Sequence, residues 1–278
     1  MTGRTAALVL SGGGAKTAAH LGACRATREA GFEPAWYVAT SMGAVVAAGL
    51  ASGVSGDELL ERLAEIGPRG VARDLLTPVA GLYLRSLMKP APLRAAIESL
   101  IPARRFSDLS VPLTVTAVDL DTGELVLFGA GATNAPLVDV LCASCALPLY
   151  YPPVVLNGRR YADGGLRAVV PLEPAAELEV ELVVAVDVGP GFDFPPSAEV
   201  SRIPPLIRAH DDAVGILMAA NTQSQLALWR ADTTRPPLVY VRPRVERHAT
   251  FRLDRVREYA QEGRRATREA LEQWGKDS

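Results

Sequence analysis

A serine at position 41 stands in the stretch Ala39-Thr40-Ser41-Met42-Gly43, between a short apolar segment and a run of small apolar residues. The stretch matches the nucleophile-elbow pattern G-x-S-x-G, except that Ala39 replaces the first glycine. On a turn from strand to helix, the serine hydroxyl lies at the helix N-terminus, where free N–H groups stabilise developing negative charge. We therefore take Ser41 as a candidate nucleophile. A serine at a helix start is also a common N-cap, so the pattern alone leaves that alternative open.

Three consecutive glycines, Gly12, Gly13 and Gly14, stand between an apolar segment and Lys16. Between a strand and a helix, glycines let the backbone bend and leave N–H groups pointing outward, which suits an anion. A phosphate-binding loop would need glycine directly before the lysine, where this chain has Ala15, so we expect no nucleotide. The loop either binds an anion or merely turns the chain.

Asp163-Gly164-Gly165 follows a short predicted strand, far along the chain from Ser41. An aspartate before glycine is usually a turn residue. Its carboxylate could also take a proton from a serine hydroxyl and return it to a leaving alcohol. The choice between these two roles depends on the other motifs.

In this order and spacing, the three motifs resemble those of the patatin-like phospholipase family, which are G-G-G-x-[KR], G-x-S-x-G and D-G-[GA]. The resemblance covers roughly residues 6 to 245 and includes Leu8 to Lys16, His20 to Gly22, Val115 to Leu120, Ala143 to Pro148, Tyr151 to Val154 and Tyr161 to Leu166. It implies one α/β domain over residues 1–278, with a mixed, largely parallel central sheet flanked by helices. It also implies a catalytic dyad of Ser41 as nucleophile and Asp163 as general base, an oxyanion hole at Gly12, Gly13 and Gly14, and neither cofactor nor metal. Among the glycines, Gly13 and Gly14 are the best candidates for the donors, and we expect Lys16 to anchor the loop or the first helix turn.

The chain departs from the family pattern at Ala39 and in the segment after the aspartate, where Arg167, Ala168 and Val169 replace residues that are often polar. None of these changes removes a reacting group. They nevertheless raise a second hypothesis, a catalytically silent lipid-binding or regulatory protein with the same fold.

The resemblance implies hydrolysis of ester bonds in lipids, with phospholipid or lysophospholipid acyl groups as the substrate. A thioesterase, a small-ester esterase and an acyl transferase use the same chemistry and stay open. Two apolar segments, Leu75 to Leu93 and Leu147 to Tyr151, would supply an acyl pocket or a rim that touches a membrane transiently. Ordinary core packing would explain the same segments.

Histidines and cysteines offer alternatives to the dyad. His210 and His248 follow Ser41 and Asp163 in the order of an α/β-hydrolase triad. In that fold several strands precede the serine elbow, whereas here one strand–helix unit does, so we expect a dyad. His20 falls inside a predicted helix, where we expect a packed, hydrogen-bonded side chain.

The cysteines are Cys24, Cys142 and Cys145. The last two form a C-x-x-C without clustered further ligands for zinc, so we expect buried thiols. Three cysteines cannot all pair, which fits a reducing cytoplasm.

Composition limits the classes of partner. The 278 residues include 29 Lys plus Arg and 31 Asp plus Glu, for a net charge of −2. This balance gives no general attraction to nucleic acid. No export signal and no membrane-spanning segment is visible, so we expect a cytoplasmic protein that is at most peripheral at a membrane.

Two strand–turn–helix units at the start of the chain must position the glycine loop and Ser41. Apolar periodicity and turn residues predict strands at 6–10, 35–39, 182–188 and 238–241 and helices at 15–30, 42–52, 55–66, 135–146, 207–229 and from about 253. Turn signals predict one hairpin over 112–128 and another at Asn157-Gly158. Residues 67–92 follow no clear period and are interpreted as a lid or long loop.

Overall fold

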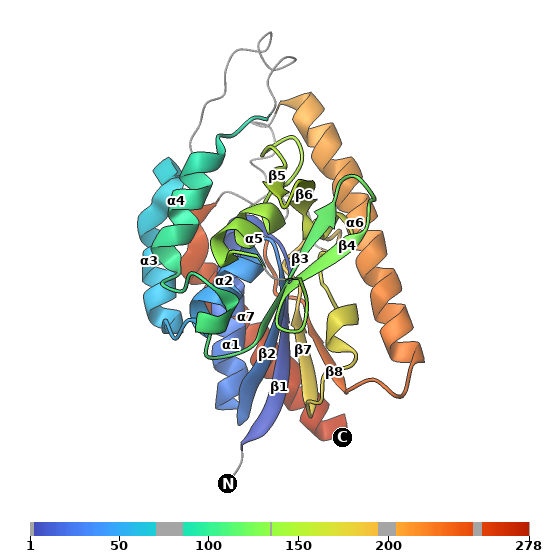
Figure 1. Ribbon diagram of the computed structural model, residues 1–278. Helices are drawn as coiled ribbons and strands as arrows, with labels where there is room; N and C mark the ends of the chain where they lie inside the picture. Colours follow the sequence, from blue (N-terminus) through green and yellow to red (C-terminus); the bar gives the residue numbers. More distant parts are fainter. Residues whose placement is uncertain (1–2, 71–85, 134, 194–203, 247–251, 278) are drawn as a thin grey trace.

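A central β-sheet organises the molecule in the computed structural model, which describes residues 3–70, 86–133, 135–193, 204–246 and 252–277 (Figure 1). The strands are β1 (Arg4–Leu10), β2 (Phe32–Thr40), β3 (Leu113–Asp119), β4 (Leu125–Gly129), β5 (Val154–Leu156), β6 (Arg159–Asp163), β7 (Leu182–Val186) and β8 (Leu238–Val241). The α-helices are α1 (Ala18–Glu29), α2 (Met42–Ala51), α3 (Gly56–Gly70), α4 (Pro90–Leu100), α5 (Leu137–Ser144), α6 (Pro205–Ala231) and α7 (Val256–Asp277). Short 3₁₀ turns are η1 (Gly14–Thr17), η3 (Phe106–Asp108), η4 (Gly164–Leu166), η5 (Glu173–Ala175) and η7 (Leu253–Arg255).

The strand order is β5-β6-β3-β2-β1-β7-β8, with β4 also paired to β3. Strands β3, β2, β1, β7 and β8 run parallel to one another, whereas β4 and β6 pair antiparallel with β3, and β5 pairs antiparallel with β6. The prediction of a mixed, largely parallel sheet is therefore confirmed. All five residues of β7 are buried, as expected of a strand covered on both faces.

Alternating residues of β1 divide the core into two layers. Leu8 and Leu10 pack on the side covered by α2, α3, α4 and α5, whereas Ala7 and Val9 pack on the side of α6. Figure 1 accordingly shows α6 at one edge of the molecule, apart from the group that contains α3 and α4. Helices α1 and α7 pack closely, because a Cβ added at Gly22 would lie only 1.8 Å from the Ala260 carbonyl oxygen.

Most predicted elements are confirmed, including both strand–turn–helix units, both hairpins and the strand Leu238–Val241. The lid or loop interpretation is wrong at both its ends, where α3 continues to Gly70 and α4 begins at Pro90. Pro90 was interpreted as a loop residue, but proline is also favoured in the first turn of a helix, where its missing N–H costs nothing. Residues 71–85 of that segment lie outside the described residues.

Smaller corrections concern element ends. The first helix begins with η1 and becomes α-helical only at Ala18, the helix predicted over 135–146 spans Leu137–Ser144, and the strand predicted over 182–188 ends at Val186. Fraying and capping at element ends depend on contacts that periodicity does not record.

Candidate active site

Ser41 stands alone between β2 and α2, on the sharp turn that the elbow pattern predicts. Its backbone has φ 55° and ψ −135°, a conformation that costs free energy in any residue with a side chain. The preceding Thr40 fixes the turn, because its hydroxyl donates to the Ala168 carbonyl at 3.0 Å and also bonds to the Thr116 hydroxyl. The strained residue is thus held by buried neighbours on β3 and after η4.

The small residues of the elbow have a packing reason. A Cβ added at Gly43 would lie 2.3 Å from the Ser11 carbonyl oxygen, so the first turn of α2 rests directly on the end of β1. Ala39 is fully buried in the core, and its methyl group is accommodated there. The replacement of glycine by Ala39 therefore leaves the geometry of the turn intact.

The Ser41 hydroxyl donates to Asp163 Oδ2 at 2.7 Å. Sheet register explains this proximity, because Thr40 at the end of β2 pairs with Thr116 of β3 and the next residue of β3, Ala117, pairs with Asp163 of β6. Strands β2 and β6 thus run toward each other along the same side of β3, opposite β4. Both predicted reacting groups lie where the ends of these two strands meet.

Asp163 is buried, with 5% of its surface exposed. Burial raises the pKa of its carboxyl from 3.8 to about 6, while hydrogen bonds from the Ser41 hydroxyl and the Gly165 N–H act in the opposite direction. The Gly165 N–H donates to Oδ1 at 2.8 Å and leaves Oδ2 for Ser41. A carboxylate with such a pKa is a much stronger base than an exposed aspartate, and it is still ionised at neutral pH.

The glycine loop passes beside Ser41, since a Cβ added at Gly12 would lie 3.2 Å from Ser41 Cβ. The Gly12 N–H donates to the Val169 carbonyl at 3.1 Å, so this structure argues against the expectation that Gly12 is an oxyanion donor. Gly14 has φ 61°, a conformation that favours glycine. Among the described residues, the N–H groups of Gly13 and Gly14 have no acceptor, and these two remain the candidate donors.

The segment after Asp163 supports the site through its backbone. The Ala168 carbonyl accepts from Thr40, and the Val169 carbonyl accepts from Gly12. Neither contact depends on a polar side chain at these positions. The departures of Ala168 and Val169 from the family pattern are therefore compatible with an intact site.

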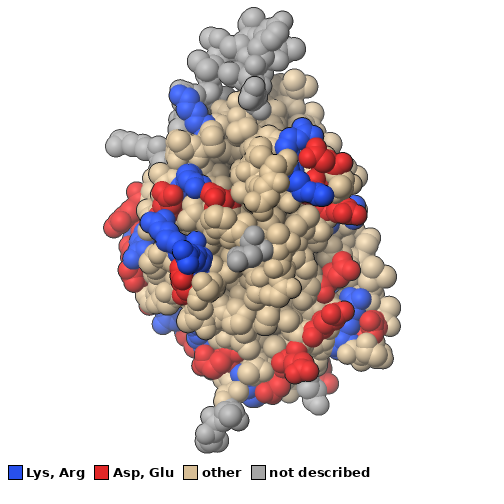
Figure 2. All heavy atoms as spheres, viewed as in Figure 1, with Lys and Arg blue, Asp and Glu red and all other residues tan. Residues whose placement is uncertain are grey.

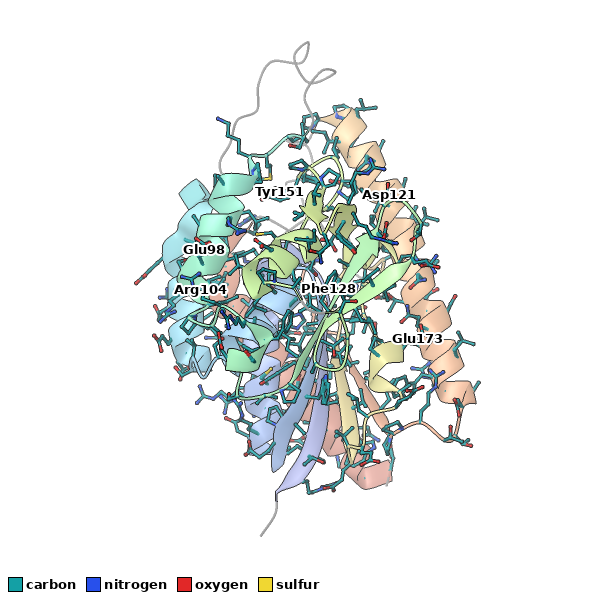
Figure 3. The ribbon with its side chains drawn as sticks, in the orientation of Figure 1. Glu98, Arg104, Asp121, Phe128, Tyr151 and Glu173 are labelled. Carbon is teal, nitrogen blue, oxygen red and sulfur yellow. The ribbon has the colours of Figure 1, made fainter. Side chains whose placement is uncertain are left out.

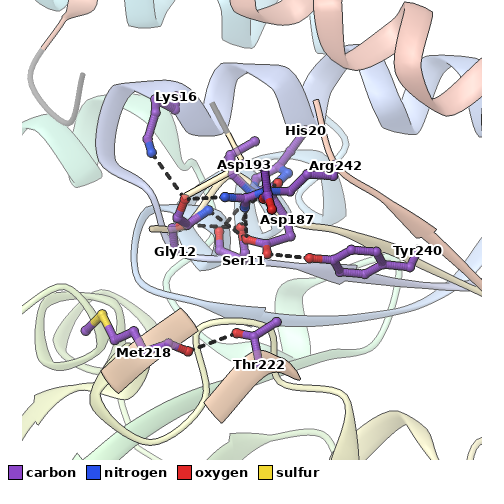
Figure 4. A network of polar contacts seen from close by, with 12 residues as sticks. Ser11, Gly12, Lys16, His20, Asp187, Asp193, Met218, Thr222, Tyr240 and Arg242 are labelled. Carbon is purple, nitrogen blue, oxygen red and sulfur yellow. Dashed lines mark hydrogen bonds and ion pairs between the residues drawn. The ribbon is translucent and has the colours of Figure 1, made fainter. Parts of the chain in front are cut away.

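A buried polar network lies behind the glycine loop (Figure 4). Asp187 pairs with Arg242 at 2.8 Å and accepts hydrogen bonds from the Tyr240 hydroxyl at 2.6 Å and the Gly189 N–H at 2.7 Å. The Gly189 carbonyl in turn accepts from Arg242 at 3.3 Å and from Lys16 at 3.4 Å. The network ties the ends of β7 and β8 to the start of the first helix. No single sequence motif indicates this network, because Lys16, Asp187 and Arg242 are far apart in the chain.

Lys16 anchors the loop as predicted, through its bond to the Gly189 carbonyl. Burial, followed by the charge of Arg242, lowers the pKa of Lys16 to about 8. His20 is packed and hydrogen-bonded, as predicted. Its Nε2 lies 2.9 Å from the Ser11 carbonyl oxygen, and burial lowers the pKa of His20 to about 4, so the neutral ring donates to this carbonyl.

Ser41 and Asp163 open into a cavity of about 270 Å³. One wall is apolar and comes from α3 and α4, with Leu63, Ile66, Pro92, Leu93, Ala96, Ile97 and Leu100. The opposite wall comes mainly from α6 and is mixed, with His210, Asp211, Asp212, Val214, Gly215 and Met218. From the predicted apolar segment, Leu147, Tyr150 and Tyr151 also line the cavity. Figure 3 shows Tyr151 at the end of the molecule where α4 and the start of α6 also lie.

The remaining candidate residues take no direct part in the contact between Ser41 and Asp163. His210 lines the cavity, but the Ser41 hydroxyl bonds to Asp163 directly; His248 lies outside the described residues. Cys142 and Cys145 are buried thiols, as predicted, and Cys24 is buried as well. Ser144, which sequence analysis did not single out, accepts the Ser41 N–H at 2.7 Å. Its place in the matched stretch Ala143 to Pro148 was the available signal, but its contact required the folded chain.

The fold and the elbow define an α/β protein with a serine–aspartate pair at the edge of its sheet. The model of the patatin-like phospholipase family matches residues 8–176. An uncharacterized NTE family protein of Mycobacterium tuberculosis is 30% identical over 208 residues, which are 73% of this chain and 56% of the relative. Human patatin-like phospholipase domain-containing protein 6 is 28% identical over 68% of this chain and 14% of its own length. The crystal structure of VipD from Legionella pneumophila aligns with 98% of this chain and 67% of that chain, with a TM-score of 0.48 and 14% identity.

The chain belongs to the patatin-like phospholipase family. It spans about half the length of the mycobacterial relatives that it matches.

Proposed function

We propose that this protein is a serine acyl hydrolase that cleaves ester bonds of lipids, with phospholipid or lysophospholipid acyl groups as substrates. The observation that carries the proposal is the 2.7 Å hydrogen bond from the Ser41 hydroxyl to the buried Asp163 carboxylate, at the base of a cavity with an apolar wall. Membership of the patatin-like phospholipase family supports it.

The reaction would run in two steps. Asp163 takes the proton of the Ser41 hydroxyl as Ser41 Oγ attacks the ester carbonyl carbon. The N–H groups of Gly13 and Gly14 stabilise the oxyanion that forms. Collapse of this intermediate breaks the ester bond, and the leaving alcohol takes the proton from Asp163. Water then attacks the acyl-serine, gives a proton to Asp163, and releases the fatty acid with the hydroxyl of Ser41 restored.

The two walls of the cavity suit the two ends of such a substrate. An acyl chain would bury its methylene groups against the wall from α3 and α4, where Leu93 and Ile97 lie. The leaving group would face the wall from α6, where Tyr150 donates a hydrogen bond of 2.6 Å to Asp211.

A fluorophosphonate probe, which reacts with activated serines, tests the proposal. The wild-type protein should be labelled, and folded Ser41→Ala should not. A panel of short esters, lysophospholipids, diacyl phospholipids and acyl thioesters should then show the highest kcat/KM with a lipid ester. A preference for acyl thioesters or short esters would favour a thioesterase or a small-ester esterase. A folded wild-type protein without label would favour a catalytically silent lipid-binding protein.

A further inference from the structure

Helix α6 covers one face of the sheet with only part of its surface. Of its 27 residues, Gly215, Met218, Thr222, Leu226 and Trp229 are buried. The positions that face away from the sheet are exposed along the whole helix. The exposed face of a helix normally carries charged and polar residues.

The outer face of α6 carries four large apolar side chains, beside the exposed polar residues Asn221, Gln223 and Ser224. Leu206, Leu217 and Leu228 are 84%, 71% and 64% exposed, and their spacing of eleven residues is close to three helical turns, so they form one line along the helix. Ile216 is 55% exposed beside this line. The helix contains no charged residue from Ala213 to Trp229. Large exposed apolar side chains in such a line mark an interaction surface.

This surface adjoins the cavity. The inner side of α6 lines the cavity through Val214, Gly215 and Met218, next to the residues that form the outer line. Four of the seven large hydrophobic side chains exposed among the described residues lie on α6. A fifth, Phe192 at 49% exposure, lines the cavity itself. Gly215 and Met218, the chain neighbours of Ile216 and Leu217, therefore line the cavity that contains Ser41.

We propose that the outer face of α6, formed by Leu206, Ile216, Leu217 and Leu228, docks on a zwitterionic lipid surface. The helix would lie flat on the lipid, since none of the described helices has the length and hydropathy to cross a bilayer. Docking on this face would place the helix that forms one wall of the cavity against the lipid. The inference goes beyond the proposed function and rests on it only for the reason that a lipid is brought to the cavity.

Charge favours a zwitterionic surface over an anionic one. Helix α6 carries Arg208 and Arg230 against Asp211 and Asp212, so its formal charge is balanced. A helix that binds anionic lipids would instead carry an excess of lysine and arginine. On the face of the molecule in Figure 2, basic and acidic side chains stand beside one another without an extended basic area.

The size of the face argues against a second copy of this chain as its partner. A 27-residue helix is about 40 Å long, so a strip about 10 Å wide would bury about 400 Å² on each partner. The total of about 800 Å² is below the ~1,200 Å² of specific, stable interfaces. A lipid surface has no such requirement, because each inserted leucine leaves water independently.

Co-sedimentation of the full chain with vesicles of diether-linked phosphatidylcholine tests the proposal, since this lipid has no ester to hydrolyse. The double variant Leu217→Gln/Leu228→Gln should bind at least tenfold more weakly than wild type. Glutamine keeps good helix propensity, and neither position lines the cavity. Turnover of a soluble short-chain ester should therefore stay within about twofold, and the thermal melt should confirm the fold. The matched control is Val155→Gln, which changes a 63% exposed side chain on β5 and should bind as wild type does.

Four results would overturn the proposal: no vesicle binding by wild type, equal binding by the double variant, an equal loss with Val155→Gln, or a dimer that the double variant dissociates. The last would assign the face to a second copy of the chain. Binding should also change little between ionic strengths of about 0.05 and 0.5 M, and a steep decrease would place the contact at arginines instead. If vesicles bind through α6 but no ester is cleaved, the proposed function fails while the docking surface stands.

Discussion

The Ser41 hydroxyl lies 2.7 Å from the Asp163 carboxylate although 122 residues separate the two in the chain. The contact is direct, with no imidazole between the hydroxyl and the carboxylate. It depends on three strands, because β2 and β6 pair with successive residues on the same side of β3, the side opposite β4. The geometry therefore matches a dyad, in which the carboxylate itself would act as the base.

Substitutions in the dyad should separate it from a triad. Ser41→Ala should abolish ester hydrolysis, and Asp163→Asn should lower kcat/KM by about a thousandfold or more, because it removes the only base. His210→Ala changes a residue of the same cavity and should retain most activity. Steady-state kinetics on one ester, with circular dichroism as the check of folding, measures all three. A loss with His210→Ala equal to that of Asp163→Asn would contradict the dyad.

The pH profile should follow the raised pKa of Asp163. A base must be ionised to accept a proton, and burial raises the pKa of this carboxyl to about 6. We therefore expect kcat/KM to fall about tenfold per pH unit below pH 6 and to be level above it, until another group titrates. A histidine base would give a similar curve, so the profile tests the burial of Asp163 and leaves the choice of base to the variants. A midpoint near 4 would contradict the burial.

The free energy of unfolding should decrease when Asp163 ionises. Because the folded pKa is higher than the unfolded value of 3.8, protonation stabilises the folded state, and this stabilisation is lost as pH rises through about 6. The shift corresponds to at most about 3 kcal/mol. Asp163→Asn removes the buried charge, so its free energy of unfolding should exceed that of wild type at pH 8. Urea unfolding at pH 8 and pH 5 tests this, and a variant less stable than wild type at pH 8 would contradict it.

Gly43→Ala should destabilise the protein and its elbow. The added Cβ would lie 2.3 Å from the Ser11 carbonyl oxygen, so α2 must move away from β1 and displace Ser41. We expect a loss of at least about 2 kcal/mol in unfolding free energy and a lower kcat. The control is Gly56→Ala at the start of α3, where a Cβ meets nothing within 4 Å. Equal melting temperatures for the two variants would show that the close approach is unimportant.

Arg242→Met should reveal what the network behind the glycine loop contributes. The change leaves Asp187 buried without its cation and removes a donor to the Gly189 carbonyl, so we expect a loss of about 3 kcal/mol in stability. Because the network holds the loop of Gly13 and Gly14, kcat should fall more than KM rises. Arg257→Met, which breaks an exposed ion pair with Glu61, should change neither the stability nor kcat. A loss of stability with unchanged kcat would make the network purely structural.

Local patterns in the sequence determined the candidate site residues and most elements of the fold. The elbow around Ser41, the three glycines and Asp163-Gly164-Gly165 are each continuous in the chain, and short-range turn chemistry specifies them. Alternation and apolar runs predicted the individual strands, whereas the mixed, largely parallel sheet was implied by the resemblance to the family. Where local rules conflict, as at Pro90, the pattern was read as a loop although proline also suits the first turn of a helix.

Tertiary structure alone decided which groups face each other and in which environment. The register of β2, β3 and β6 places Ser41 beside Asp163, and the burial that raises the pKa of Asp163 follows from that placement. The bond from Gly12 to the Val169 carbonyl, which leaves Gly13 and Gly14 as the candidate donors, likewise joins distant segments. Hydrogen bonds and desolvation depend on distances between atoms, and residues far apart in a chain acquire fixed distances only when the chain folds.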